Sequence, residues 1–183
     1  MLKFMLHRLY RKLHKRMREQ KNRDLPFCDL LFDRYERAND LGFSEGASIY
    51  QSSCVFGDVQ VGEKTWIGPN VILDGSGGLT IGKSCCIGAC SQIYTHDSVR
   101  WALSGAKEEQ ERAPVSIGDC CFIGPLTVIA KGVTISDHCV IGACSYVDKD
   151  IPSYTVAFGR PAVPVRKLDP SEFQQPMKDI DYF

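Results

Sequence analysis

The 183-residue chain has no net charge, no long apolar run, and no disulfide or metal-binding pattern of cysteines. Lysine and arginine together number 22, as do aspartate and glutamate. No stretch approaches the roughly 18 consecutive apolar residues of a membrane span. The nine cysteines are odd in number and include no C-x-x-C pair, which argues against a disulfide framework and a zinc knuckle. This composition favours one soluble domain with reduced thiols in the cytoplasm.

Positive charge is concentrated at the N-terminus. Residues 1–24 hold nine lysines and arginines against two acidic residues, so the remainder of the chain is acidic by seven. Apolar side chains recur there at helical spacing, and basic side chains cover most of the remaining circumference, which predicts a basic amphipathic helix. The apolar residues are Leu2, Met5, Leu6, Leu9, Leu13 and Met17. Basic residues also interrupt the apolar run that a secretory signal peptide requires.

This helix has three conceivable partners. Packing within the subunit or on a neighbouring subunit is the simplest interpretation, and peripheral contact with an anionic bilayer is the main alternative. Nucleic acid is disfavoured, because the chain has no second basic patch and no aromatic platform.

A branched aliphatic residue recurs every six positions over most of the chain. The fourteen positions are Ile49, Val55, Val61, Ile67, Leu73, Ile81, Ile87, Ile93, Ile117, Ile123, Ile129, Ile135, Ile141 and Val147. Six residues is the period of a short strand followed by a tight corner, not of a helix or a sandwich. Three such strands close a triangular coil, and stacked coils align the aliphatic residues in inward ladders. The sequence therefore predicts an all-β solenoid, a parallel β-helix, over residues 45–152.

Small residues occupy fixed places in this repeat. Glycine follows seven of the aliphatic residues, at 62, 68, 82, 88, 118, 124 and 142. We expect these glycines to supply backbone conformations that a Cβ would hinder. The fourth residue after the aliphatic one is usually small or β-branched, which suits the inside of a corner. Cys85, Cys121 and Cys139 take this place, so we expect compact core side chains there, not catalytic or metal-binding groups.

Two interruptions break the rhythm. The step that follows Leu73 is eight residues long, which predicts a flexible corner bulge at 74–78. The step that follows Ile93 is 24 residues long, a multiple of six, so we expect an inserted loop at 94–116 that leaves the register intact. Such insertions on one face of a solenoid are commonly its binding loops.

The two flanks of the repeat are irregular. Residues 25–44 suit a capping segment with a short helix, because the end of a solenoid exposes its ladder and must be covered. Residues 153–183 form a C-terminal segment, and its last part, 168–183, is typical of a loosely packed or domain-crossing tail.

The end of the solenoid carries the most specific motif. It comprises Val140-Ile141-Gly142-Ala143-Cys144-Ser145-Tyr146-Val147, then Lys149-Asp150-Ile151-Pro152, then Gly159-Arg160-Pro161-Ala162 and Val165-Arg166-Lys167. Together with the hexads it resembles the hexapeptide-repeat acyltransferases, above all the bacterial sugar and polysaccharide O-acetyltransferases, over about residues 45–167. Cys144 and Tyr146 depart from the family, which commonly has glycine and a small aliphatic residue there, and either narrow the CoA channel or alter its wall.

This resemblance implies a left-handed parallel β-helix, a homotrimer with intersubunit active sites, and acetyl-CoA as co-substrate. It makes residues 153–183 a CoA-contacting segment with a tail, and it implies no metal. The residues that it assigns to CoA are Gly142, Ala143, Gly159, Arg160, Pro161, Ala162, Arg166 and Lys167. The amide of Gly142 or Ala143 is a plausible donor to the oxyanion that forms during acyl transfer.

Acyl transfer from a thioester to a hydroxyl needs a base, and imidazole titrates close enough to neutrality for this role. His7 and His14 lie in the basic helix, His138 lies at an exposed corner, and His96 stands at the root of the inserted loop. The resemblance implies that His96 is the catalytic base. Asp97 either orients this imidazole or binds acceptor hydroxyls, because adjacent side chains rarely point together. Whether a carboxylate or a backbone carbonyl orients the ring stays open.

The inserted loop should shape the acceptor site. Tyr94, Arg100 and Trp101 are expected to contact the acceptor, although Arg100 and Trp101 equally fit a solvated loop with one packed ring. We expect an acetyl-CoA-dependent O-acetyltransferase acting on a sugar or a cell-surface polysaccharide precursor. N-acetylation of an amino sugar, and acetylation of serine or an antibiotic, are the enzymatic alternatives. A β-helix carbonic anhydrase is disfavoured because the coils offer only His96 and His138, and a non-enzymatic scaffold stays open.

Overall fold

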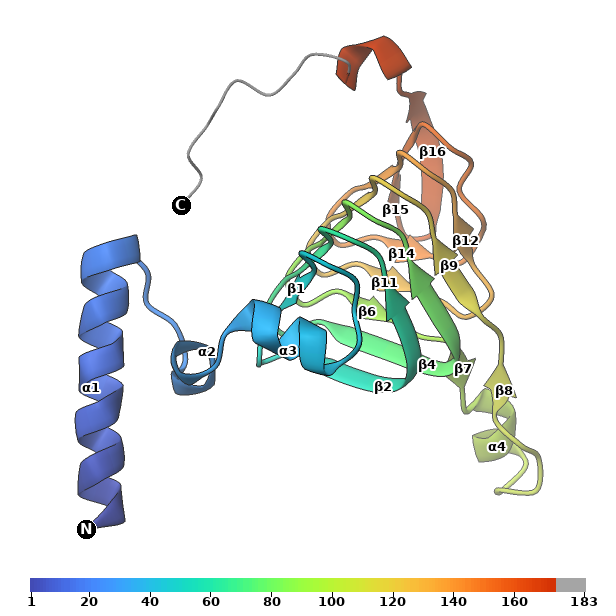
Figure 1. Cartoon of the computed structure of the whole chain (residues 1–183). Coiled ribbons are helices and arrows are strands. Elements are labelled where there is room, and N and C mark those ends of the chain that lie inside the picture. The colour runs from blue at the N-terminus through green and yellow to red at the C-terminus, as the bar shows by residue number, and fades with distance from the viewer. Residues whose placement is uncertain (174–183) are drawn as a thin grey trace.

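The computed structural model describes residues 1–173, which form a left-handed parallel β-helix with helices at its N-terminal end (Figure 1). Short strands stack coil upon coil along three faces of a triangular prism, and the stacked strands pair in parallel. The predicted all-β solenoid is therefore confirmed.

Each coil crosses the three faces in turn. The first face holds β1 (Ser48–Ile49), β3 (Trp66–Ile67), β5 (Cys86–Ile87), β10 (Phe122–Ile123), β13 (Val140–Ile141) and β15 (Thr155–Gly159). The second holds the first half of β2 (Cys54–Val61) and of β4 (Ile72–Ile81), then β6 (Gln92–Ile93), β11 (Val128–Ile129) and β14 (Tyr146–Val147). The third holds the second halves of β2 and β4, then β9 (Val115–Ile117) and β12 (Thr134–Ile135).

The turns between faces stack as well and are named here by the face that they follow. Corner A follows the first face and includes residues 88–91, 124–127 and 142–145. Corner B follows the second face and includes 56–59, 74–78, 94–114, 130–133 and 148–149. Corner C follows the third face and includes 82–85, 118–121 and 136–139.

The hexad residues form the core. Thirteen of the fourteen are buried, and Val55 is partly buried. Cys85, Cys121 and Cys139 are buried at corner C, as expected for compact core side chains. Because burial of an aliphatic side chain contributes about 1.5–3 kcal/mol, this continuous ladder is the main stabilising feature of the solenoid.

The expected reason for the repeated glycines needs correction. Gly62 has no left-handed backbone; instead, a Cβ there would lie 2.6 Å from the carbonyl carbon of Gly82 in the next coil. The left-handed conformation falls on other corner residues, such as Ser84 at φ 56° and His138 at φ 57°. Glycine is thus required by the close stacking of coils and not by its own φ angle.

The bulge predicted at 74–78 is present, but it lies within a continuous strand and is not a flexible corner. β4 runs unbroken through these residues and pairs with β2 on both sides of a register shift between Gly57 and Val59. Gly75 passes so close to the preceding coil that a Cβ would lie 2.1 Å from the carbonyl oxygen of Asp58. The extra residues are absorbed in an ordered β-bulge, and Asp74 is buried beneath it.

The inserted loop is a hairpin that leaves from corner B. β7 (His96–Asp97) pairs antiparallel with β8 (Glu111–Arg112), and α4 (Val99–Leu103) lies between them. Figure 1 shows this hairpin and α4 projecting from one corner of the prism. β9 resumes the third face at Val115, so the excursion is slightly shorter than the predicted 94–116.

The N-terminal end of the ladder is covered by α2 (Phe27–Leu31) and α3 (Arg34–Asp40), in the region where a capping segment was expected. Ala38 and Phe43 join the core, and the Arg37 guanidinium donates hydrogen bonds to the carbonyls of Tyr50 and Ser53 in the first coil. α1 (Leu2–Lys21) stands apart and buries none of its residues (Figure 1). Among residues 1–173, no helix is long and apolar enough to span a membrane.

The C-terminal segment extends the fold past residue 152, where the solenoid was expected to end. β15 pairs in parallel with β13, and β16 (Ala162–Lys167) folds back antiparallel onto β15. A short 3₁₀ helix, η1 (Pro170–Phe173), follows. Most of the tail predicted at 168–183 lies outside the described residues.

Candidate functional site

The hairpin is fastened to the solenoid by Thr95, which is fully buried. Its carbonyl accepts a hydrogen bond from the Ala113 amide at 2.9 Å, where the chain returns to the prism. Its hydroxyl group accepts a hydrogen bond from the Gly77 amide at 2.7 Å. The same hydroxyl donates a hydrogen bond to the Asp74 carbonyl at 2.8 Å. The residue before His96 is therefore held by both the bulge of β4 and the far end of the loop.

His96 and Asp74 form a hydrogen-bonded pair at corner B. Nδ1 of His96 lies 2.6 Å from Oδ2 of Asp74. The Asp74 side chain is 2% exposed, whereas that of His96 is 29% exposed. A carboxylate beside Nδ1 places the ring proton on that nitrogen and leaves Nε2 as the proton acceptor. No hydrogen-bond partner of Nε2 is present among residues 1–173.

The surroundings of the Asp74 carboxylate favour its ionised form. Burial alone would raise its pKa, but hydrogen bonds outweigh burial: they come from the Ser76 hydroxyl, the Thr95 amide, the His96 ring and the Ser76 amide. Together they hold the pKa of Asp74 well below its usual range. An ionised carboxylate on Nδ1 stabilises the imidazolium that forms when Nε2 accepts a proton.

Asp97 lies beside His96 in the sequence but has a different partner. Its Oδ2 lies 2.6 Å from Nζ of Lys131, in the next coil of corner B, and Lys131 also contacts Glu111 at 2.8 Å. Hydrogen bonds from Lys131 lower the pKa of Asp97 and of Glu111, and the contact with Asp97 raises the pKa of Lys131. Lys131 therefore ties both strands of the hairpin to the solenoid, while Asp74 is the carboxylate in contact with the imidazole.

The predicted acceptor residues lie along the same hairpin. The Tyr94 hydroxyl donates to the Gln92 side chain at 2.8 Å. Arg100 is ion-paired to Glu108 at 2.8 Å and approaches Glu111 at 3.6 Å, and Trp101 is 46% exposed. The guanidinium is thus already engaged within the loop, whereas the indole is open to solvent.

The residues assigned to CoA gather elsewhere on the same chain. Gly142 and Ala143 lie at corner A, and Arg160 and Pro161 form the turn between β15 and β16. Gly159 and Ala162 pair at the two ends of that turn, Ala162 is buried, and Arg166 and Lys167 end β16. The Arg160 guanidinium also donates to the Cys144 carbonyl at 2.7 Å. These assigned residues therefore cluster at the C-terminal end of the solenoid.

One chain does not bring this cluster to His96. Corners A and B lie at opposite ends of the second face, and five residue-to-residue steps lead from Ala143 to Asp148. At about 3.3 Å per residue for extended backbone, these steps span at most roughly 16 Å across the face. His96 also lies two coils below β14 along the prism.

The two candidate oxyanion donors differ in the structure. The Gly142 amide donates to the Ala157 carbonyl at 2.9 Å, so it is not available to a substrate. The Ala143 amide has no backbone acceptor among the described residues 1–173. Of the two amides, only that of Ala143 is still able to serve as the predicted donor.

The sequence reading missed Asp74 and Lys131. Asp74 followed the one eight-residue step, next to two glycines that close packing requires, and this was the available signal. Lys131 carried no signal of its own, because its partner Asp97 is 34 residues away. No group of three metal-ligating side chains occurs within residues 1–173, and all nine cysteines are free.

Comparisons with known proteins agree with this architecture. A family model described as "Bacterial transferase hexapeptide (six repeats)" matches residues 114–149. The putative colanic acid biosynthesis acetyltransferase WcaF of Escherichia coli K12 is 32% identical over 111 residues, covering 58% of this chain and 57% of that protein. The chain therefore spans little more than half the length of this curated relative.

Two solved structures are similar over nearly the whole chain. A galactoside acetyltransferase in complex with coenzyme A has a TM-score of 0.69 at 26% identity, covering 95% of this chain and 88% of that chain. A maltose O-acetyltransferase from Clostridium difficile 630 has a TM-score of 0.61 at 28% identity, covering 90% and 89%. The hexad ladder, the family-model match over residues 114–149 and these shared folds show that the chain is similar to the hexapeptide-repeat acetyltransferases.

Proposed function

We propose that the protein is an acetyl-CoA-dependent O-acetyltransferase that acts on a hydroxyl of a sugar or of a polysaccharide precursor. The observation that carries the proposal is the hydrogen-bonded pair of His96 and Asp74, placed at the root of the inserted hairpin of a hexapeptide solenoid. The relatives support the reaction class, since their names include galactoside and maltose O-acetyltransferases.

In this proposal His96 is the general base. Nε2 takes the proton of the acceptor hydroxyl as its oxygen attacks the thioester carbonyl, and Asp74 stabilises the imidazolium at Nδ1. The tetrahedral intermediate places negative charge on the former carbonyl oxygen, toward which the Ala143 amide donates. Collapse breaks the carbon–sulfur bond, and the imidazolium returns its proton to the leaving thiolate. The products are the acetyl ester and CoA with a free thiol.

We further propose that the site is completed by a second subunit of a homotrimer. Within one chain the base at corner B and the CoA residues at corner A are separated by the width of a face. A neighbouring subunit that presents its corner A to this corner B would supply Ala143, Arg160 and the other CoA residues. The coenzyme A bound by the similar galactoside acetyltransferase supports acetyl-CoA as the co-substrate.

The hairpin supplies the acceptor side of the proposed site. Asp97, Tyr94 and Trp101 offer a carboxylate, a phenol and an exposed ring face within a few residues of the base, which suits a polyhydroxylated acceptor.

Acetyl-CoA as donor and nine free thiols both favour a cytoplasmic location. N-acetylation of an amino sugar, or acetylation of serine or an antibiotic, would use the same base.

The decisive experiment is a steady-state assay with acetyl-CoA and paired acceptors that differ only in a hydroxyl or an amine. We expect turnover with sugar hydroxyls and a thermal shift on addition of CoA, since a ligand at a hundredfold excess over its Kd adds about 2.7 kcal/mol of stability. Turnover with amines alone would replace O- by N-acetylation. No CoA-dependent shift would favour the scaffold, and stoichiometric zinc in the purified protein would reopen the carbonic anhydrase alternative.

A further inference from the structure

We propose that α1 is an anchor that lies along the surface of an anionic phospholipid bilayer. The inference rests on the exposed side chains and charge of this helix and is independent of the proposed catalytic activity.

The first observation is an uncovered apolar stripe. Leu2, Met5, Leu6 and Leu9 are spaced at i, i+3, i+4 and i+7, so they share one side of the helix. Their exposed fractions are 70%, 60%, 44% and 38%, and α1 as a whole buries no residue. The helix is not long and apolar enough to cross a bilayer. An amphipathic helix of this kind lies in the interface, with its apolar side toward the acyl chains.

The second observation is charge. Residues 1–24 carry nine lysines and arginines, and their two acidic residues are already engaged: Glu19 with Lys15 at 3.7 Å and Asp24 with His14 at 2.9 Å. The remainder of the chain is acidic by seven, so attraction to anionic headgroups is confined to this segment. Basic residues near an anionic leaflet contribute independently to binding and do so over about one Debye length.

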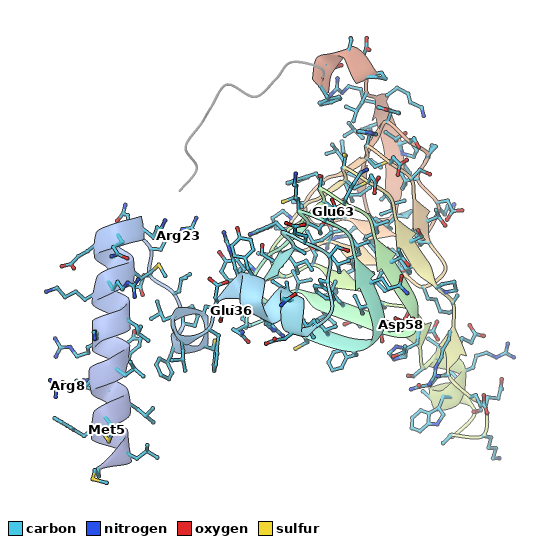
Figure 2. The ribbon with its side chains drawn as sticks, viewed as in Figure 1. Met5, Arg8, Arg23, Glu36, Asp58 and Glu63 are labelled. Atoms are coloured by element: carbon cyan, nitrogen blue, oxygen red, sulfur yellow. The ribbon has the colours of Figure 1, made fainter. Side chains whose placement is uncertain are left out.

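The position of α1 leaves the stripe accessible. The helix is attached further along the same side: Tyr10 lies four residues after Leu6, and its ring meets the Phe27 ring of α2 edge-on at a centroid distance of 5.9 Å, which leaves residues 2–9 uncovered. Figure 2 shows Arg8 on the side of α1 turned away from the solenoid. A second copy of α1 is a poorer occupant of the stripe than a bilayer, because two helices with this excess of positive charge repel each other, whereas anionic headgroups neutralise both.

The test is vesicle co-sedimentation of the full-length protein, with phosphatidylcholine alone or mixed with phosphatidylglycerol. We expect binding only to the mixture, and weaker binding at raised ionic strength. Arg8→Gln/Arg11→Gln should weaken binding about 25-fold, because each basic residue near the surface contributes about 1 kcal/mol. Leu6→Glu/Leu9→Glu should weaken it at least about tenfold. The control is Leu103→Glu, which places a negative charge on the 85% exposed Leu103 of α4, outside α1, and should bind like the parent.

Other outcomes would overturn the anchor. These are no binding to either vesicle, equal binding to both, or a loss of binding in Leu103→Glu as large as in the α1 variants. A change in oligomeric mass of Leu6→Glu/Leu9→Glu, without any vesicle binding by the parent, would instead assign the stripe to a neighbouring subunit. Circular dichroism and thermal unfolding should show that each variant is folded, because α1 buries no residue.

Discussion

The aliphatic ladder and corner B differ in how far their side chains repeat from coil to coil. Along the ladder the same kind of side chain recurs and each coil repeats the one before. At corner B successive coils present an exposed Asp58, a buried Asp74, the His96 hairpin and then Lys131 (Figure 2 marks Asp58). The regular ladder fixes the distance between coils, and corner B uses this fixed spacing to bring polar groups from three coils together. Stability and chemistry should therefore be separable by mutation.

The largest effect is expected from removing the base at corner B. His96→Ala should lower kcat by about a thousandfold, because general base catalysis typically contributes 10²–10⁴. CoA affinity and oligomeric mass should stay unchanged. The measurement is steady-state turnover, with His138→Asn as the control at corner C, where asparagine accommodates the left-handed backbone. Activity of the His96 variant close to that of the parent would mean that another group is the base.

The next effect belongs to the ladder. Ile135→Ala should lower the free energy of unfolding by about 3 kcal/mol, because it removes a fully buried side chain and leaves a cavity between coils. The neighbouring Thr134 of β12 is exposed, and Thr134→Ala should cost far less. Chemical denaturation measures both. If the turnover of folded Ile135→Ala at low temperature fell as far as that of the His96 variant, the separation of ladder and corner would fail.

Changing the partner of the base should have a somewhat smaller effect. Asp74→Asn should reduce kcat by about a hundredfold, since the amide no longer stabilises the imidazolium or fixes the ring tautomer. KM for acetyl-CoA should change little. Asp58→Asn, at the exposed position one coil earlier, is the control in the same assay. Equal losses in the two variants would indicate a general disturbance of corner B.

Loosening the hairpin should cost less again. Lys131→Met should reduce kcat/KM for the acceptor by about tenfold or less, because Asp97 and Glu111 lose their common tie to the solenoid. Lys149 follows Val147 as Lys131 follows Ile129, and it is exposed, so Lys149→Met is the matched control. An effect on kcat for every acceptor, without a change in KM, would argue against a role in acceptor placement.

The smallest expected effect is on acid stability. The pKa of Asp74 is lower in the folded protein than in the unfolded chain, so its ionised form stabilises the fold at neutral pH. This contribution is lost progressively as the pH falls below about 4, the unperturbed value for aspartate. Unfolding free energies measured from neutral pH downward should therefore decline less steeply for Asp74→Asn than for the parent. Parallel curves would contradict the lowered pKa.

The ladder could be predicted from the sequence because every coil repeats an inward aliphatic side chain, and thirteen of these positions are buried in the structure. His96 could be predicted through the break in the hexads and through family resemblance. Asp74 was missed because burial of that carboxylate depends on how β4 passes over Asp58, a contact between coils that no local pattern reports. The sequence left open whether Asp97 orients the imidazole or binds acceptor hydroxyls. Successive side chains on a strand point to opposite sides, and Asp97 contacts Lys131 instead of His96.

The length of the hairpin has a consequence for diversification. The excursion from Ile93 to Ile117 is a whole number of hexads, and its two ends are joined by the hydrogen bond between Thr95 and Ala113. The stacking of the coils therefore does not depend on the residues inserted between these two ends. The segment that follows His96 is exchangeable: new loops that keep Thr95, His96 and Ala113 can be grafted while the coils on either side stay unchanged. A change of acceptor specificity then requires substitutions in this loop alone.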